Sequence, residues 1–77
     1  MTLVDLRQFD RALKDYAESI RLDPSSGLYL KNRATVFRIT RKYAEAIADY
    51  RKALTMKIDA ALKKEIKTAL RELGLPA

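Results

Sequence analysis

The chain has 77 residues with a net charge of +6, and it contains no cysteine and no histidine. It therefore has no disulfide, no thiolate metal ligand and no imidazole to act as ligand or general base. Its two glycines are far apart, which excludes a glycine-rich phosphate-binding loop. We expect one small domain or a piece of a larger array, with no cofactor, no metal site and no enzymatic activity.

The positive charge is unevenly distributed. Residues 1–26 carry four basic and five acidic side chains, whereas residues 27–77 carry twelve basic and five acidic ones. A positive field over the larger part favours acidic partners. No apolar run approaches the length of about 20 residues that crosses a bilayer, and no signal peptide is recognisable. The expectation is a cytoplasmic protein without membrane insertion.

The first predicted helix carries apolar residues at steps of three and four: Leu6, Phe9, Leu13, Tyr16 and Ile20. It ends at Asp23, because a proline disfavours helical geometry in the residue before it. No glycine or proline interrupts residues 3–22, so one long helix and a hairpin with a short first arm both remain open. Ser25 or Ser26 is expected to cap the next helix.

The second predicted helix covers about residues 28–40, with Leu30, Ala34 and Phe37 facing inward. The third covers about residues 43–56. Its predicted buried face consists of Tyr43, Ala46, Ile47, Tyr50, Ala53 and Leu54. The links between these helices are short, which favours antiparallel neighbours.

Asp59 is a predicted N-cap for a fourth helix over about residues 60–73. One side of this helix is apolar and the opposite side is basic. Gly74 is expected to adopt a left-handed C-cap conformation, with Leu75 folding back and Pro76 ending the helix. The apolar side holds Leu62, Ile66, Ala69, Leu70 and Leu73, and the basic side holds Lys63, Lys64, Lys67 and Arg71.

The first and third predicted helices repeat each other. Four pairs of similar or identical residues share one offset (46 − 12 = 34). They are Phe9 and Tyr43, Ala12 and Ala46, Asp15 and Asp49, and Tyr16 and Tyr50. A fixed period of this length is typical of stacked helical repeats.

With this repeat, the chain resembles the tetratricopeptide repeat family. The pattern of the first helix of a repeat is matched by Leu30, Arg33, Ala34 and Phe37. The pattern of the second helix is matched by Tyr43, Ala46, Tyr50 and Ala53. Phe9, Ala12, Tyr16 and Ser19 match the second helix of a preceding repeat. Arg33 stands where the family prefers leucine, so its stem is expected along apolar surface with the guanidinium in water. Ile58 stands where proline is usual.

The resemblance implies an all-α fold of antiparallel helical hairpins, of the α-solenoid type. Residues 1–24 would be a partial repeat, mainly its second helix, residues 25–58 a complete repeat, and residues 59–77 a closing helix. In the family, peptides bind the concave face formed by the first helix of each repeat. At the matching positions this face would consist of Leu28, Lys31, Asn32, Thr35, Arg38 and Ile39. These side chains suit an acidic or C-terminal peptide segment, although Lys31 and Asn32 as ordinary surface residues remain an alternative.

The partial repeat leaves an apolar face without its first helix. The face predicted for self-association consists of Leu3, Leu6, Phe9 and Tyr16. Either another copy of the chain covers it in a homo-oligomer, or the chain is a fragment of a longer array, or a monomer folds its short first arm back. Contact of the basic surface with nucleic acid or the ribosome is a less favoured alternative, because no stacking aromatic accompanies the basic stripe.

Overall fold

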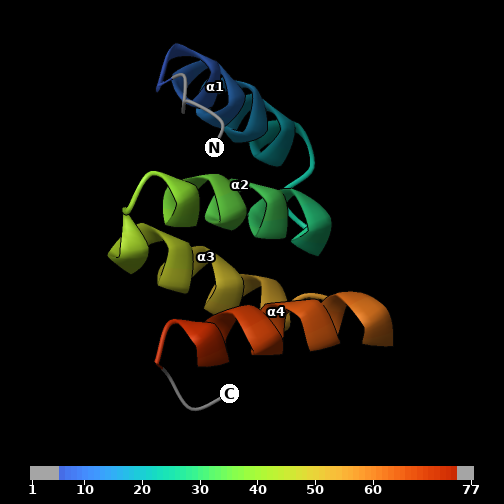
Figure 1. The fold of residues 1–77 in the computed structure, drawn as a ribbon. Coiled ribbons are helices and arrows are strands. Elements are labelled where there is room, and N and C mark those ends of the chain that lie inside the picture. Colours follow the sequence, from blue (N-terminus) through green and yellow to red (C-terminus); the bar gives the residue numbers. More distant parts are fainter. Residues whose placement is uncertain (1–5, 75–77) are drawn as a thin grey trace.

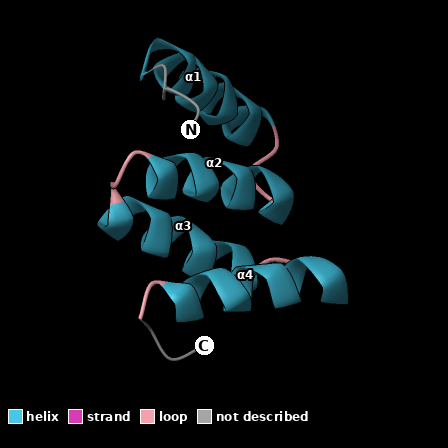
Figure 2. Ribbon diagram, viewed as in Figure 1, coloured by secondary structure: helices cyan, strands magenta, loops and turns pink. Residues whose placement is uncertain are grey.

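The computed structural model describes residues 6–74, and side chains from residue 7 onward, as four helices arranged in a row (Figure 1). The described residues contain only helices and short connections (Figure 2). Each helix packs against the next, with α1 and α4 at opposite ends. The predicted all-α class is confirmed. The helices are α1 (Leu6–Leu22), α2 (Gly27–Ile39), α3 (Tyr43–Leu54) and α4 (Ala60–Glu72).

The helix boundaries follow local signals. The Ser26 hydroxyl accepts a hydrogen bond from the Tyr29 amide at 3.3 Å, so Ser26 is the cap of α2. Ser25 instead donates to the Asp23 carboxylate. The Asp59 carboxylate accepts a bond from the Leu62 amide at 2.8 Å, as predicted for α4. Side-chain acceptors satisfy amides that have no partner inside the first turn of a helix.

The end of α2 is closed by a residue that the sequence did not indicate. Arg41 adopts a φ of 65°, a left-handed conformation usually left to glycine. The Arg41 amide donates to the Arg38 carbonyl at 3.1 Å and the Lys42 amide donates to the Phe37 carbonyl at 2.7 Å. This is the Schellman arrangement of a helix C-terminus. Gly74 ends α4 with a φ of 85°, as expected, whereas Leu75 and Pro76 lie outside the described residues.

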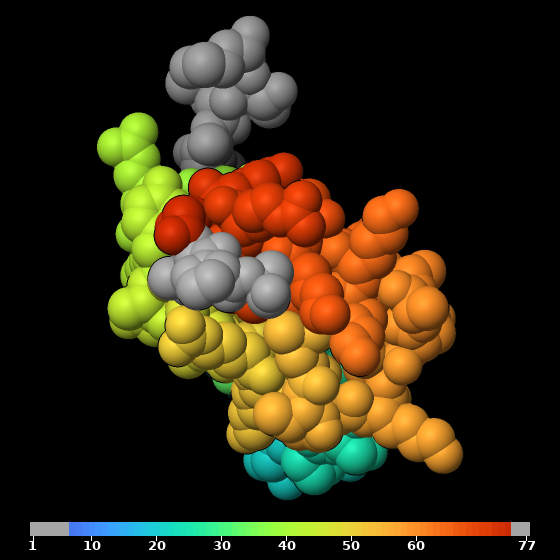
Figure 3. All heavy atoms as spheres, turned by 90° about the horizontal axis from the view of Figure 1, so that it is seen from below, coloured from blue at the N-terminus to red at the C-terminus, as the bar shows by residue number. Residues whose placement is uncertain are grey.

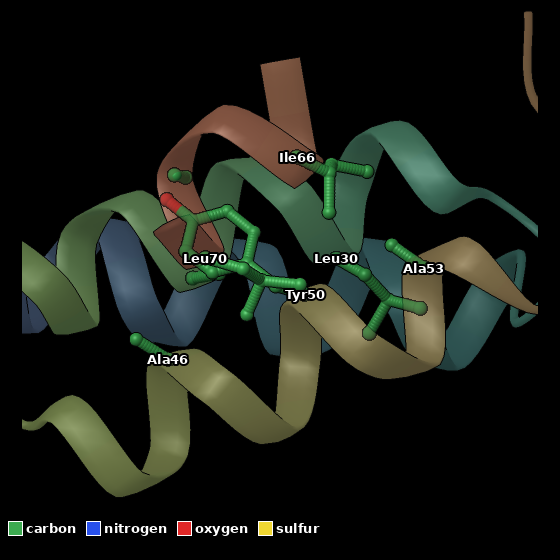
Figure 4. Close-up of a cluster of buried hydrophobic side chains, with 8 residues drawn as sticks. Leu30, Ala46, Tyr50, Ala53, Ile66 and Leu70 are labelled. Carbon is green, nitrogen blue, oxygen red and sulfur yellow. The ribbon is translucent and has the colours of Figure 1, made fainter. Parts of the chain in front are cut away.

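The core lies between α2, α3 and α4. Labelled side chains from these three helices point toward one another in Figure 4. The small residues of α3 allow the close approach of its neighbours, and the Tyr50 ring fills the space that they leave. The buried cluster consists of Leu30, Ala34, Ala46, Tyr50, Ala53, Ile66, Ala69 and Leu70, with Ile47, Leu54 and Phe37 partly buried against it.

The prediction of one core residue is wrong. Tyr43 is 47% exposed, although the sequence pattern placed it on the buried face of α3. It is the first residue of α3, and it lies at the margin of the core beside an open hollow that Ile39 and Leu73 also line. The helical period identifies the direction of a side chain, but it does not show how far the covering helix extends.

The first helix is less covered than the others. The stripe of Phe9, Leu13, Tyr16 and Ile20 is only partly buried, and no side chain described in residues 7–22 is fully buried. Of this stripe, Ile20 packs against the main core. Residues 6–22 form one helix. Leu3, the side chain of Leu6 and the short first arm of the alternative hairpin lie outside the described part. No helix within residues 6–74 has the length and apolar character needed to cross a membrane.

Candidate functional site

Three of the predicted concave-face residues lie together in one groove. Lys31, Thr35 and Arg38 of α2 line a groove of about 480 Å³. They stand at steps of four and three, so they occupy one face of the helix. Tyr50 of α3 and six residues of α4 complete the lining. The α4 residues are Ala61, Lys64, Glu65, Thr68, Ala69 and Glu72.

The other three predicted residues lie apart from this groove. Ile39 borders a neighbouring hollow of about 550 Å³, which shares Arg38 and Glu72 with the groove. Leu28 and Asn32 line neither space. Leu28 is exposed and Asn32 is partly buried. The predicted face is therefore divided between the groove, a neighbouring hollow and two residues outside both.

Both cations that α2 contributes to the groove face carboxylates of α4. The Lys31 Nζ lies 3.5 Å from a Glu65 oxygen, and Arg38 donates a hydrogen bond of 2.5 Å to Glu72. The hydrogen bond to Glu72 raises the pKa of Arg38 above its ordinary value. Arginine is already charged at every physiological pH, so this pairing affects which anion Arg38 contacts and not its charge.

Sequence reasoning did not identify the acidic partners, although a signal for them was present. Glu65 follows Lys31 by the repeat period (65 − 31 = 34), and Glu72 follows Arg38 by the same number. Residues separated by one period occupy equivalent places in adjacent units, so their side chains can meet across the groove. Applying the period to the cations as well as to the apolar residues would have found both pairs.

Tyr50 contributes a polar group to the groove from the core. Its side chain is almost completely buried, and its hydroxyl lies 3.3 Å from the Thr35 hydroxyl. Thr35 in turn donates to the Lys31 carbonyl at 3.0 Å. Because the Thr35 proton is used in that bond, we assign Tyr50 as the donor to Thr35. This chain of bonds holds the middle of the α2 wall in a fixed position.

The guanidinium of Arg33 does not lie in water, which corrects the prediction. It binds the Asp49 carboxylate through two hydrogen bonds of 2.7 and 2.8 Å, and these bonds raise the pKa of Arg33. Asp49 is buried, with 6% of its surface exposed. The guanidinium also lies 5.8 Å from the centre of the Phe37 ring. A buried carboxylate requires such a partner, so Arg33 serves as a structural cation at a position where the family prefers leucine.

The basic residues of α4 lie along a further hollow. This hollow of about 310 Å³ is lined by Lys63, Lys64, Lys67 and Arg71, and it shares Lys64 and Thr68 with the groove. In Figure 3, which is viewed from the α4 end of the row, α3 and α4 form much of the visible surface. The basic stripe faces solvent, and the sequence of α4 contains no aromatic residue that could stack on a base.

The polar groups of the groove are cations, carboxylates and hydroxyl groups. Within residues 6–74, no three acidic side chains converge as metal ligands would. Every buried side-chain nitrogen or oxygen in this part has a hydrogen-bond partner. What the groove offers is two fixed cations, a further lysine at position 64 and hydroxyl groups, which together suit the binding of anionic side chains.

Comparison with known proteins supports the repeat. The tetratricopeptide repeat pattern matches residues 1–61. Sperm-associated antigen 1 of Rattus norvegicus is 34% identical over 71 residues, which is 91% of this chain and 8% of the relative. The same protein of Mus musculus is 34% identical over 62 residues, 80% of this chain and 7% of the relative. No solved structure gives a significant match. The chain belongs to the tetratricopeptide repeat family, whose repeats generally mediate protein–protein interaction.

Proposed function

We propose that this chain is a protein-interaction module that binds an acidic peptide segment on the concave face of α2. The observation that carries the proposal is that the groove already holds carboxylates against two cations. Lys31 and Arg38 contact Glu65 and Glu72, so the groove has room for carboxylates at both places. The proposed binding face comprises Leu28, Lys31, Asn32, Thr35, Arg38 and Ile39.

The chemistry of this face suits a peptide. An arginine can hold a carboxylate with two parallel hydrogen bonds, and a lysine adds a mobile point charge. The Asn32 amide both donates and accepts, which matches a peptide backbone. Leu28 and Ile39 are 49% and 47% exposed, and they provide apolar contacts at the two ends of α2. The positive charge of residues 27–77 attracts acidic segments over longer distances.

The test is the loss of peptide binding when a groove cation is removed. A fluorescein-labelled peptide rich in aspartate and glutamate is titrated with the protein, and binding is followed by fluorescence anisotropy. Arg38→Gln is expected to weaken binding by roughly tenfold, the effect of losing a charged hydrogen bond. Arg51→Gln is the matched control, because Arg51 is exposed on α3 and lies outside the groove. Equal losses for the two variants would contradict the proposal.

We further propose that residues 1–24, 25–58 and 59–77 act as a partial repeat, a complete repeat and a closing helix. In this arrangement the face of α1 is a second interaction surface, which a second copy of the chain covers. The partial burial of Phe9 and Tyr16 supports it, since apolar side chains left half-covered favour association. Leu3 and Leu6 would extend this surface.

A further inference from the structure

The carboxylates of α4 already form ion pairs with the cations that a ligand of the groove would need. Glu65 pairs with Lys31 and Glu72 pairs with Arg38, and both acidic residues line the same groove as the cations. The Arg38 and Glu72 side chains are 38% and 52% exposed, so water and a ligand can reach the pair. Ion pairs this exposed are weak, and a competing carboxylate can replace one partner.

The two cations define a spacing. Lys31 and Arg38 are seven residues apart on one helix, which separates them by about 10 Å at 1.5 Å per residue.

An extended chain in the polyproline II conformation matches the spacing. It rises by about 3.1 Å per residue with three residues per turn, so residues three apart lie on one side at about 9 Å. Two acidic residues separated by two others would therefore place their carboxylates at Lys31 and Arg38 together. Adjacent acidic residues would reach only one of the two cations.

We propose that Glu65 and Glu72 act as a built-in competitor, which makes the groove prefer extended peptides carrying two carboxylates three residues apart. This inference rests on the proposed function, since it concerns the ligand of the same groove. A peptide with a single carboxylate displaces one of the two glutamates from its cation and leaves the other ion pair intact. A peptide with the matched spacing replaces both, so the competition acts as a selectivity device.

The experiment compares two fluorescein-labelled octapeptides of equal charge, one containing Glu-Pro-Pro-Glu and the other two adjacent glutamates, both completed with glycine and serine. Each is titrated at low salt with the wild-type chain and with Glu72→Gln, Glu65→Gln and Glu45→Gln. Glu45→Gln is the matched control, because it changes the net charge equally and Glu45 is exposed on α3 outside the groove. Circular dichroism confirms that each variant is folded.

Glu72→Gln and Glu65→Gln are each expected to tighten binding of the spaced peptide by about threefold, the equivalent of one exposed ion pair. Glu45→Gln should leave the affinity at the wild-type value, and the wild-type chain should prefer the spaced peptide. If the gain is the same for Glu45→Gln, or absent for Glu72→Gln, while Arg38→Gln still weakens binding, the competitor is excluded and the proposed function stands. If neither peptide binds any variant, the proposed function fails and the inference fails with it.

Discussion

At the scale of single residues, the Arg33–Asp49 pair explains a departure from the family pattern. A leucine at position 33 would need only apolar neighbours, whereas the arginine brings a charge to a partly buried place. Asp49 of α3 supplies the opposite charge through two hydrogen bonds. Asp15 matches Asp49 by the repeat period, but it is exposed. The same residue type at equivalent positions therefore has a structural partner in one repeat and faces solvent in the other.

Arg33→Leu restores the residue that the family prefers, yet we expect it to destabilise this chain. Asp49 would remain buried without its hydrogen-bond donors, and a loss of this kind costs about 2–3 kcal/mol. Urea unfolding followed by circular dichroism measures the change. Adding Asp49→Ala should recover more than half of the loss, because the buried charge is then removed as well.

Arg51→Leu provides the control for this prediction. Arg51 is exposed on the same helix as Asp49, so its replacement should change stability by less than about 0.5 kcal/mol. The interpretation of Arg33 as a structural cation is wrong if Arg33→Leu costs as little as Arg51→Leu.

At the scale of elements, Gly27 determines how closely α2 approaches the connection between α3 and α4. A Cβ atom at this position would overlap the Ile58 Cγ2 atom and would lie 3.5 Å from the Met56 Cβ. Gly27 is the first residue of α2 and is buried. The close approach brings the start of α2 against the connection that follows α3.

Gly27→Ala is expected to destabilise the fold by about 1–3 kcal/mol through overpacking against Ile58. The Ile58 Cγ2 atom is bonded to a branched Cβ, so it cannot move aside as the tip of a long side chain would. In an Ile58→Ala background the same glycine substitution should cost almost nothing, since the overlapping methyl group is gone. The comparison is a double-mutant cycle measured by thermal or urea unfolding.

Gly74→Ala serves as the matched glycine control. Gly74 has open space around the position of a Cβ but a φ of 85°, so alanine should cost about 1 kcal/mol through backbone strain alone. That cost should be the same in the wild-type chain and in the Ile58→Ala background. An equal cost of Gly27→Ala in both backgrounds would show that Ile58 is not the cause.

At the scale of the whole molecule, the main core is shared by α2, α3 and α4, while α1 lies at one end with a half-covered apolar stripe. A chain of this size buries only about 60% of the surface of its unfolded form. Additional apolar burial is therefore a large fraction of the total stability. This imbalance is the reason to expect association through α1.

Sedimentation equilibrium at several protein concentrations tests this expectation. The mean mass should rise with concentration above the monomer value of 8.8 kDa, because association follows mass action. Phe9→Glu and Tyr16→Glu should each lower the mass toward the monomer, since each places a charge in the apolar stripe. Gln8→Glu is the control, because Gln8 is exposed beside the stripe and should have no effect. A wild-type mass of 8.8 kDa at every concentration would exclude self-association.

The sequence by itself determined the four helices and several of their ends. The spacing of apolar residues in steps of three and four predicted the buried face of α4 and the buried Leu30 and Ala34 of α2, but it missed Val36, which is also buried. Asp59 and Gly74 marked the ends of α4. These features depend on interactions within one or two helical turns, so short segments contain the whole signal. The 34-residue period added the repeat, because it compares one segment with another.

Only the tertiary structure decided which charges meet and which edges stay open. It paired Arg33 with Asp49, left Tyr43 exposed, and separated Leu28 and Asn32 from the groove that Lys31 lines. Such outcomes depend on side chains from different helices approaching within a few ångströms. A pattern along one helix specifies the direction of a side chain, but the distance to its neighbour is determined by how the helices pack.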